Sequence, residues 1–340
     1  MLKSILKFCQ PPWKLGQRVT TEVPCCLTGS TDAVVVATRD RHLRPLCTVI
    51  SVESGLVFVD PRPSTAEVQE FYEKDYRQQY KKTLTPHKRH VYRAGLAAQN
   101  RLEVLNQFGK PGMRLLDIGA GGGEFVYLAK QQGFDASGIE PNRGYAEYAR
   151  NQYQIDIQVG SLQDIQLEPE SYDLITMFHV LEHLDSPVTV LQDLVAALKF
   201  GGQLLIEVPN VECCKSSPWY KWHVGHLYHY NVPTLEMLGR SLGLHSHSVW
   251  ASGYGSLVQA TFEKVYHPEV VNPEILAGNF EKTLGILQQH TPLSYLTNYS
   301  RRIERVKQKI NRHWDERQQT IKIENPQQIL DETIDNRKAV

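Results

Sequence analysis

An acidic residue followed by three alternating glycines is the most informative pattern in this chain. The apolar run that begins at Leu115 ends at Asp117, and Gly119, Gly121 and Gly123 come after it. Glycine lets the backbone turn tightly and approach a ligand closely, and a helix that begins behind such a turn offers free N–H groups. A second acid, Glu140, lies about 20 residues further on, where acidic residues commonly bind ribose hydroxyls. The pair predicts a nucleoside cofactor across two adjacent strand ends.

The spacing of the glycines excludes a dinucleotide. The dinucleotide fingerprint needs Gly-x-Gly-x-x-Gly, but its third glycine position falls on Glu124 or Val126 in the two possible registers. Carboxylates at both ends of the turn, Asp117 and Glu124, also suit a cationic cofactor better than a pyrophosphate. The segment resembles the glycine loop of class I S-adenosylmethionine-dependent methyltransferases, Asp-x-Gly-x-Gly-x-Gly, with every position filled. The resemblance implies S-adenosyl-L-methionine as cofactor.

The resemblance also implies roles for single residues around the cofactor. Asp117 is expected to organise the turn or to accept hydrogen bonds near the methionine part, and Glu140 to accept from both ribose hydroxyls, since a carboxylate can take two donors. The alternatives are a turn-capping aspartate and a solvent-facing acid at a strand end. The remaining candidates for cofactor binding are Pro141, Ser161, Leu162, Asp164 and Phe178.

A first candidate catalytic segment, 178–184, follows the predicted fourth strand. It resembles the His-Val-Leu-Glu-His segment of a methyltransferase group that includes quinone-ring and small-molecule O-methyltransferases. His179 could abstract a proton from an acceptor hydroxyl, because imidazole titrates near neutral pH. The alternative is a histidine that packs on the cofactor or hydrogen-bonds a backbone carbonyl. Glu182 and His183 are expected to hold the local loop together.

A second candidate segment, 222–231, contains three histidines and two tyrosines after the predicted fifth strand. The family pattern at this place is His-Leu-x-x-Phe, which closes over the acceptor; His226 and Leu227 match it, and Tyr230 replaces the Phe. We rank acceptor binding and proton abstraction by His226 and His229 first, structural packing second and a metal site third. Methyl transfer in this family needs no metal, so none is predicted.

The elements that must position these residues alternate between strand and helix from Arg114 onward, as in a doubly wound parallel sheet. The predicted strands are Arg114–Ile118, Ala136–Glu140, Ile155–Gly160, Tyr172–Phe178 and Gly202–Val208. The predicted helices are Glu124–Gln132, Gly144–Tyr153, Ser186–Leu198 and Leu235–Leu242. Two further strands, Ser246–Ser252 and Ser256–Lys264, flank a Gly-Tyr-Gly turn. The expected fold is α/β: a doubly wound, seven-stranded Rossmann-like methyltransferase sheet with a small N-terminal β module and C-terminal helices.

The N-terminal part resembles the zinc-ribbon-like module of many bacterial methyltransferases, with most of its ligands replaced. Cys25 stands at the first ligand position, but Thr28, Ser51 and Ser54 stand at the others, and tetrahedral zinc needs four good donors. A degenerate, metal-free module is therefore expected over residues 20–65. The other expected divisions are a helical cap or linker at 66–110, the methyltransferase domain at 111–265 and a helical extension at 266–340.

The extension reads as two helices and a tail. The helices are expected over Asn272–Gln289 and Tyr295–Lys322, and the polar stretch Glu324–Val340 is expected to fray. Arginine and lysine cluster in the second helix, where a solvated basic face is favoured over a lipid or nucleotide-sugar contact.

Composition limits the partners. The 37 Lys and Arg balance the 37 Asp and Glu, so the chain lacks the net positive charge typical of non-specific nucleic-acid binding. No apolar stretch approaches about 18 residues, so no membrane-spanning helix is expected. Six cysteines without a disulfide framework favour the cytoplasm.

The predicted function is S-adenosylmethionine-dependent methyl transfer to an oxygen or carbon atom. The expected acceptor is a small molecule or a glycan or nucleotide-sugar precursor. The alternatives are a non-catalytic scaffold that retains the fold, and a nicotinamide oxidoreductase, which the missing third glycine opposes.

Overall fold

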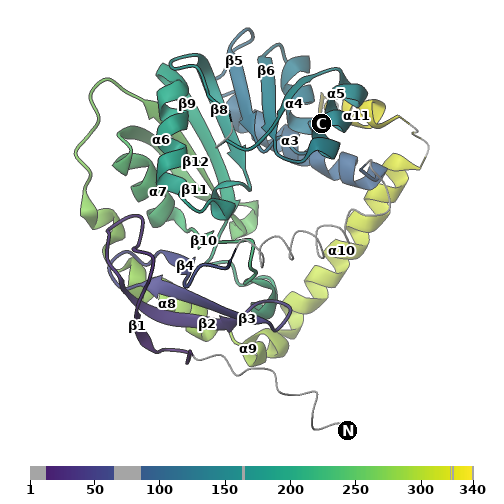
Figure 1. Cartoon of the computed structure of the whole chain (residues 1–340). Coiled ribbons are helices and arrows are strands. Elements are labelled where there is room, and N and C mark those ends of the chain that lie inside the picture. The colour runs from purple at the N-terminus through teal and green to yellow at the C-terminus, as the bar shows by residue number, and fades with distance from the viewer. Residues whose placement is uncertain (1–12, 65–85, 163–164, 322, 324, 339–340) are drawn as a thin grey trace.

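A computed structural model describes residues 13–64, 86–162, 165–321, 323 and 325–338 of the chain. Two sheets lie one above the other in Figure 1, and helices of the C-terminal part connect their outer sides. The segment 65–85, where part of the expected helical cap falls, lies outside the described residues, and so does Asp164.

The large sheet has seven strands in the order β11-β12-β9-β8-β5-β6-β7. Its parallel strands are β5 (Arg114–Ile118), β6 (Asp135–Glu140), β7 (Asp156–Val159), β8 (Tyr172–Phe178) and β9 (Leu198–Pro209). An antiparallel pair, β11 (Leu244–Ser252) and β12 (Leu257–Lys264), closes the sheet beside β9 through a short 3₁₀ turn at Gly253–Gly255. The predicted fold class is confirmed, and the main difference is that β9 begins at Leu198, directly after the preceding helix.

Alternating burial explains why both faces of this sheet are covered. Successive residues of a strand point to opposite faces, and Leu115 and Leu116 accordingly belong to two different hydrophobic clusters. One face carries α3 (Lys88–Leu105), α4 (Glu124–Gln131), α5 (Arg143–Tyr153) and α11 (Pro326–Lys338). The other face carries α6 (Pro187–Ala197), α7 (Val232–Ser241) and the small sheet.

The small sheet has the order β1-β2-β3-β4-β10. Its strands are β1 (Arg18–Thr20), β2 (Asp32–Arg39), β3 (Pro45–Ser51), β4 (Val57–Val59) and β10 (Tyr228–His229). The last of these comes from the histidine-rich segment, where Tyr228 pairs with Phe58 and His229 with Val57. The N-terminal module therefore holds one side of the candidate acceptor segment.

Two of the expected ligand positions in this module, one kept and one replaced, come together. The Sγ atom of Cys25 lies 3.2 Å from the Oγ atom of Ser54, and both residues are buried. One thiol and one hydroxyl supply a single good zinc donor. The degenerate zinc-ribbon-like character of the module stays a prediction.

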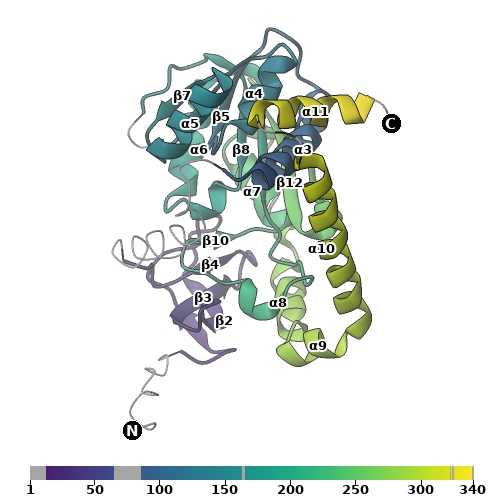
Figure 2. The ribbon, with the colours of Figure 1, turned by 90° about the vertical axis from the view of Figure 1, so that its right-hand side faces the viewer.

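The C-terminal part corrects three expectations. The first predicted helix is interrupted at Gly278, whose φ of +68° separates a 3₁₀ turn, Pro273–Leu276, from α8 (Asn279–Gln289). The second is divided into α9 (Pro292–Thr297) and α10 (Tyr299–Thr320). The prediction of a frayed end was wrong, because α11 packs against α3 and buries Ile329 and Leu330 completely. Figure 2 shows α10 running from α9 to α3 and α11.

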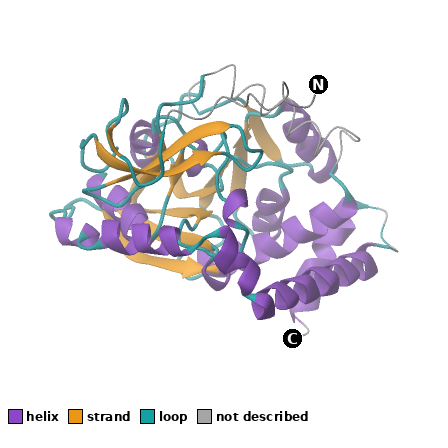
Figure 3. Cartoon of the chain, turned by 90° about the horizontal axis from the view of Figure 1, so that it is seen from below, coloured by secondary structure: helices purple, strands orange, loops and turns teal. Residues whose placement is uncertain are grey.

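Seen from below, helices lie mainly along the lower and right-hand sides of the strands (Figure 3). Among the described helices, none combines the length and the apolar character that crossing a membrane would require.

Candidate active site at the carboxyl edge of the sheet

The glycine loop connects β5 to α4 with left-handed backbone at each of its alternating glycines. Gly119 has a φ of +74°, and a Cβ atom there would lie 2.4 Å from Cγ2 of Val180. Gly123, with a φ of +81°, caps α4, and a Cβ atom there would lie 2.7 Å from Cβ of Ala149. Side chains are thus excluded at both ends of the loop, because of backbone conformation and of close packing.

Glu140 is in direct contact with this loop. Its Oε2 atom accepts a hydrogen bond of 2.8 Å from the backbone N–H of Gly121, and Oε1 accepts one of 2.8 Å from that of Asn142. Burial raises the pKa of Glu140, while these two hydrogen bonds act in the opposite direction. Each oxygen keeps a lone pair for another donor, so the carboxylate is already oriented for a ligand with paired hydroxyls. Pro141 follows it in a bend before α5.

Two buried carboxyl groups lie on either side of the loop. Asp117, at 2% exposure, accepts a 2.6 Å hydrogen bond at Oδ1 from the hydroxyl of Thr176 on β8. Burial raises the pKa of Asp117 to about 7 and does the same for Glu124, the first residue of α4. A cationic ligand would stabilise the ionised form of such groups.

His179 follows β8 directly and lies between two carboxylates. Its Nδ1 atom is 3.5 Å from Oε1 of Glu182, and its Nε2 atom is 3.4 Å from Oε1 of Glu207 on β9. Burial lowers the pKa of His179, but the two carboxylates outweigh burial and raise it to about 9. The side chain is 43% exposed, and its φ of +57° is a strained conformation of the kind that gathers at functional sites.

Arg101 of α3 completes this group from the opposite side. Its guanidinium donates to Oε1 of Glu207 at 2.5 and 3.1 Å, and it lies 4.2 Å from the centroid of the Phe178 ring. The other oxygen of Glu207 accepts from Gln259 of β12 at 2.7 Å. Burial opposes ionisation of Glu207, but His179 and Arg101 outweigh burial and lower its pKa to about 2. Glu207 is therefore a fixed anion that links β8, β9, β12 and α3.

Glu182 forms the centre of a histidine cluster. Its side chain is 1% exposed, and neither carboxylate oxygen has a hydrogen-bond partner among the described residues. Oε1 lies 3.9 Å from Nε2 of both His183 and His226. Burial lowers the pKa of His226, and the nearby His223 adds to this effect.

These three side chains could offer one metal ligand each, since their ligand atoms all lie within 4.8 Å of one another. The 3.9 Å separations exceed the roughly 3.3 Å between ligands of a tetrahedral ion with bonds near 2.0 Å. The cluster is therefore wider than a closed zinc site, and metal-free methyl transfer stays a prediction.

The histidine-rich segment is fixed to the turn that carries Glu182. The backbone N–H of Leu227 donates to the carbonyl of Glu182 at 2.8 Å, and Nδ1 of His183 lies 2.5 Å from the carbonyl oxygen of Gly225. His229 is buried, burial lowers its pKa to about 3, and its ring packs edge-on against Trp222. His179 and His226 are thus brought to one cluster, whereas His229 lies deeper, in the small sheet.

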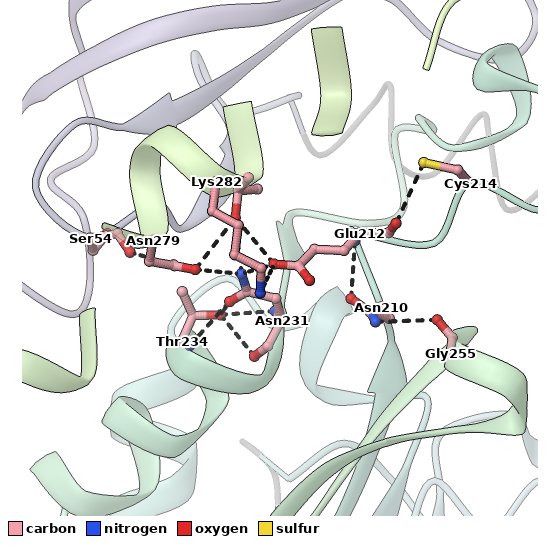
Figure 4. A network of polar contacts seen from close by, with 10 residues as sticks. Ser54, Asn210, Glu212, Cys214, Asn231, Thr234, Gly255, Asn279 and Lys282 are labelled. Atoms are coloured by element: carbon pink, nitrogen blue, oxygen red, sulfur yellow. Dashed lines mark hydrogen bonds and ion pairs between the residues drawn. The ribbon is translucent and has the colours of Figure 1, made fainter. Parts of the chain in front are cut away.

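A buried polar network anchors the end of the same segment (Figure 4). The side-chain amide of Asn231 donates to Glu212, Asn279 and Thr283 at 2.8, 2.8 and 3.0 Å. Asn279 of α8 in turn donates to the backbone carbonyl of Ser54 at 2.8 Å. The network joins the N-terminal module, the histidine-rich segment and α8.

The other predicted cofactor residues lie around the same edge. Phe178 is the last residue of β8 and packs edge-on against Phe125 of α4 at 4.9 Å between ring centroids. Ser161 and Leu162 follow β7, and Leu162 packs partly buried against the core. Asp164 lies outside the described residues.

Sequence reasoning missed Arg101, Thr176, Glu207 and Gln259 as members of this site. Only Glu207 left a signal: it is an acid in an otherwise apolar strand, Leu204-Leu-Ile-Glu-Val208. The others stand in ordinary helix and strand patterns, and only the tertiary fold shows that they converge.

A separate cavity of about 390 Å³ lies among the small sheet, Trp222 and α8. Lys221 and His290 are its ionisable lining residues. Its described lining includes no residue of the glycine loop, so it is distinct from the cofactor side of the site.

Comparisons with known proteins agree with this geometry. Residues 88–247 match a family model described as a methyltransferase domain. A ubiquinone biosynthesis O-methyltransferase of Xanthomonas campestris pv. campestris (strain B100) is 31% identical over 106 residues, which cover 29% of this chain and 44% of the relative. The corresponding protein of Coxiella burnetii (strain Dugway 5J108-111) is 26% identical over 104 residues, again 29% and 44% of the two chains. The match thus spans less than half the length of these curated relatives.

Among solved structures, an SAM dependent methyltransferase from Aquifex aeolicus has a TM-score of 0.40 at 23% identity, covering 48% of this chain and 89% of that one. The glycine loop, the contact between Glu140 and Gly121, the order of the sheet and the family match agree with one another. Residues 88–247 are therefore similar to a methyltransferase domain, and S-adenosyl-L-methionine is the cofactor that this similarity implies.

Proposed function

We propose that the protein transfers a methyl group from S-adenosyl-L-methionine to a small-molecule acceptor, at an oxygen or carbon atom. The observation that carries the proposal is the meeting of two groups at one sheet edge. Glu140 and the glycine loop lie at the ends of β6 and β5, and His179 lies at the end of the neighbouring β8. Ligands of open α/β sheets bind beyond the carboxyl ends of such strands.

The cofactor-side residues have separate tasks in this proposal. Glu140 would accept hydrogen bonds from the two ribose hydroxyls, and Asp117 would stabilise positive charge near the methionine part. Ser161, Leu162 and Asp164 would lie toward the adenine, and Phe178 and Pro141 would contact the cofactor. S-adenosyl-L-methionine supplies an electrophilic methyl group on a sulfonium, so the protein chiefly has to position the reactants, exclude water and remove a proton.

The acceptor-side residues are histidines. The side chain of His179 is 43% exposed, and its two ring nitrogens face Glu182 and Glu207, one nitrogen each. Carboxylates in that position would stabilise the proton that the imidazole takes up. We infer that His179 removes the proton, and that His226 and His229 hold the acceptor and the segment that covers it.

Transfer to oxygen is favoured, because the curated relatives that match this domain are named O-methyltransferases. Transfer to carbon, and a sugar or glycan precursor as acceptor, stay within the proposal as the sequence predicts them.

Activity with a labelled cofactor tests the proposal directly. Purified full-length protein would be incubated with S-adenosyl-L-methionine labelled at the methyl group and with pools of phenolic, sugar and nucleotide-sugar acceptors. We expect label transfer to at least one pool and its loss in His179→Ala, with the exposed His247→Ala as control. Tight cofactor binding without transfer to any pool would instead favour a scaffold that retains the fold.

A further inference from the structure

A second cavity, with a volume of about 460 Å³, lies between the beginning of α3 and the second half of α10. Figure 2 shows these two helices side by side, although they are more than 200 residues apart in the sequence. Its volume is within the range of about 300–1,000 Å³ that is typical of small-molecule sites. The function described above does not use this cavity.

The walls of the cavity are strongly cationic. Arg89 and Arg93 come from α3, and Lys309 and Arg312 come from α10, together with three histidines. Among the described lining residues, Glu316 is the only acid. The chain as a whole has a formal net charge of zero, so this excess of positive charge is local.

Glu316 leaves part of this charge without compensation. Its Oε1 atom lies 3.2 Å from Nε of Arg93 and 3.5 Å from Nε of Arg312, and the residue is buried. Nη1 of Arg89 lies 3.2 Å from Nδ1 of His313, a side chain that carries no negative charge to balance the guanidinium. In the part of the chain that the structure describes, no carboxylate forms an ion pair with Arg89 or Lys309. Like charges held together in this way repel one another unless an anion binds between them.

The surroundings of His90 are consistent with a positive local potential. Burial lowers the pKa of His90, and the charges of Arg93 and His87 lower it further. Tyr92 fixes the geometry from within α3, because its hydroxyl donates to Asp315 of α10 at 3.3 Å. This hydrogen bond connects the two helices that form the cavity, whereas the Arg and Lys side chains that line it are exposed.

The same helix connects the cavity to the active site. Arg101, which binds Glu207 at the carboxyl edge of the sheet, lies eight residues after Arg93 and twelve after Arg89. At about 1.5 Å per residue, the cavity is roughly 12–18 Å further along α3. A molecule with an anionic group at that distance from its reacting atom could occupy both places.

We propose that this cavity binds a phosphate or diphosphate group, and that this group is the anionic end of the acceptor. Guanidinium groups match phosphate oxygens with paired, charge-assisted hydrogen bonds, and a lysine adds a point charge. The first part of the proposal stands on the cavity alone, and the second part rests on the proposed function.

Calorimetric titration with inorganic pyrophosphate tests the first part. Wild-type protein should bind it saturably, and Arg89→Glu and Lys309→Glu should each weaken binding by at least about tenfold, because each removes a charged hydrogen-bond donor. Lys307→Glu is the matched control: it makes the same charge change on α10 outside the cavity. Absence of saturable binding, or equal loss in Lys307→Glu, would overturn the proposal. Affinity for S-adenosylhomocysteine should be unchanged in all three variants, which shows that they fold.

Two further probes identify the source of the phosphate. Uridine diphosphate represents a soluble acceptor, and phosphatidylcholine vesicles that contain phosphatidic acid represent a lipid headgroup. If Arg89→Glu abolishes the binding of one probe, that probe identifies the source of the phosphate. If both probes bind equally well to wild-type protein and to Arg89→Glu, the proposed site is wrong.

The acceptor screen tests the second part. An acceptor pool that wild-type protein methylates would be treated with phosphatase before the reaction. This treatment should abolish methylation of the pool by wild-type protein. Unchanged methylation after that treatment would show that the anion at this cavity is not the acceptor. Pyrophosphate binding without methylation of any pool would overturn the proposed function and leave the anion site standing.

Discussion

Asp117 and Glu124 are carboxyl groups whose pKa values the fold raises into the neutral range. Both are buried beside the glycine loop, and burial raises the pKa of each to about 7. Since their pKa values are higher in the folded than in the unfolded chain, the stability they contribute is fully present below about pH 4. It is lost as the pH rises through about 7.

Replacing Asp117 with Asn should remove this pH dependence while keeping an oxygen that accepts from Thr176. As pH rises from 5 to 8, the wild type should lose on the order of 3 kcal/mol of its free energy of unfolding relative to the Asp117→Asn variant. Chemical denaturation of unliganded wild type and variant at several pH values measures this. A difference that stays constant with pH would contradict a buried, protonatable Asp117.

His179 shows the opposite kind of perturbation, because carboxylates surround it. The charged groups that face it are Glu182 from its own turn, Glu207 from β9 and His226 from the histidine-rich segment, with Arg101 acting through Glu207. Its pKa of about 9 means that the neutral, proton-accepting form is a minority at neutral pH, reaches one half near pH 9 and continues to increase above it.

The pH profile of methyl transfer should therefore rise through neutral pH, with a midpoint near pH 9, and level off above that value. Glu182→Gln removes one of the two carboxylates and should move the midpoint downward by on the order of one pH unit. Glu263→Gln, beside the exposed His247 at 2.6 Å, makes the same chemical change outside the site and should leave the profile unchanged. A rate that falls with rising pH would exclude His179 as the base.

At the scale of elements, α11 is the clearest case of tertiary context overriding sequence character. Its Leu330 fills a space that the absence of a side chain at Gly95 leaves on α3, where a Cβ atom would lie 2.8 Å from Cδ2 of Leu330. Tyr127 of α4 also donates to Asp331 at 2.7 Å. The C-terminal helix thus supports the helix that begins at the glycine loop.

This packing predicts compensating substitutions. Leu330→Ala should lower the free energy of unfolding by about 2–5 kcal/mol, and Gly95→Ala should cost about 1–3 kcal/mol by overpacking. The double variant should be more stable than the sum of the two costs predicts, because the added methyl group fills part of the cavity. Urea denaturation measures all three, and strict additivity would contradict the contact.

The network around Asn231 makes α8 a support for the histidine-rich segment. Asn279→Ala leaves the Ser54 carbonyl without its donor and should cost about 1–3 kcal/mol of stability. We expect methyl transfer to fall while affinity for S-adenosylhomocysteine is kept, since the glycine loop is not touched. Asn272→Ala, a capping residue outside the network, is the matched control. Equal effects of both substitutions on turnover would contradict a positioning role for α8.

The predictable part of this fold is the part governed by local sequence. The alternation of strand and helix, the glycine loop and Glu140 could be predicted because each rests on short-range periodicity and spacing. The burial of α11 could not, since it depends on Gly95 more than 200 residues earlier. The convergence of Arg101 and Gln259 on Glu207 was hidden for the same reason, because a polar residue in a helix or strand carries no mark of its distant partner.

At the scale of the whole molecule, three parts of the chain meet at one edge of the large sheet. The N-terminal module pairs with β10. The helix α8 supports the histidine-rich segment, and α11 supports the helix behind the glycine loop. The helix α3 supplies Arg101. The methyltransferase domain accounts for the cofactor side. The N-terminal module, α8 and α11 lie outside residues 88–247, the range that matches the family model.

Calorimetric titration of the full chain with S-adenosylhomocysteine, in wild type and in Glu140→Ala, tests the central claim most directly. We predict saturable binding at one site and a loss of affinity of at least about tenfold in the variant, because two ribose hydrogen bonds to a carboxylate are removed. NAD should not bind either protein. Equal affinity of wild type and variant for S-adenosylhomocysteine, or tight binding of NAD, would contradict the account.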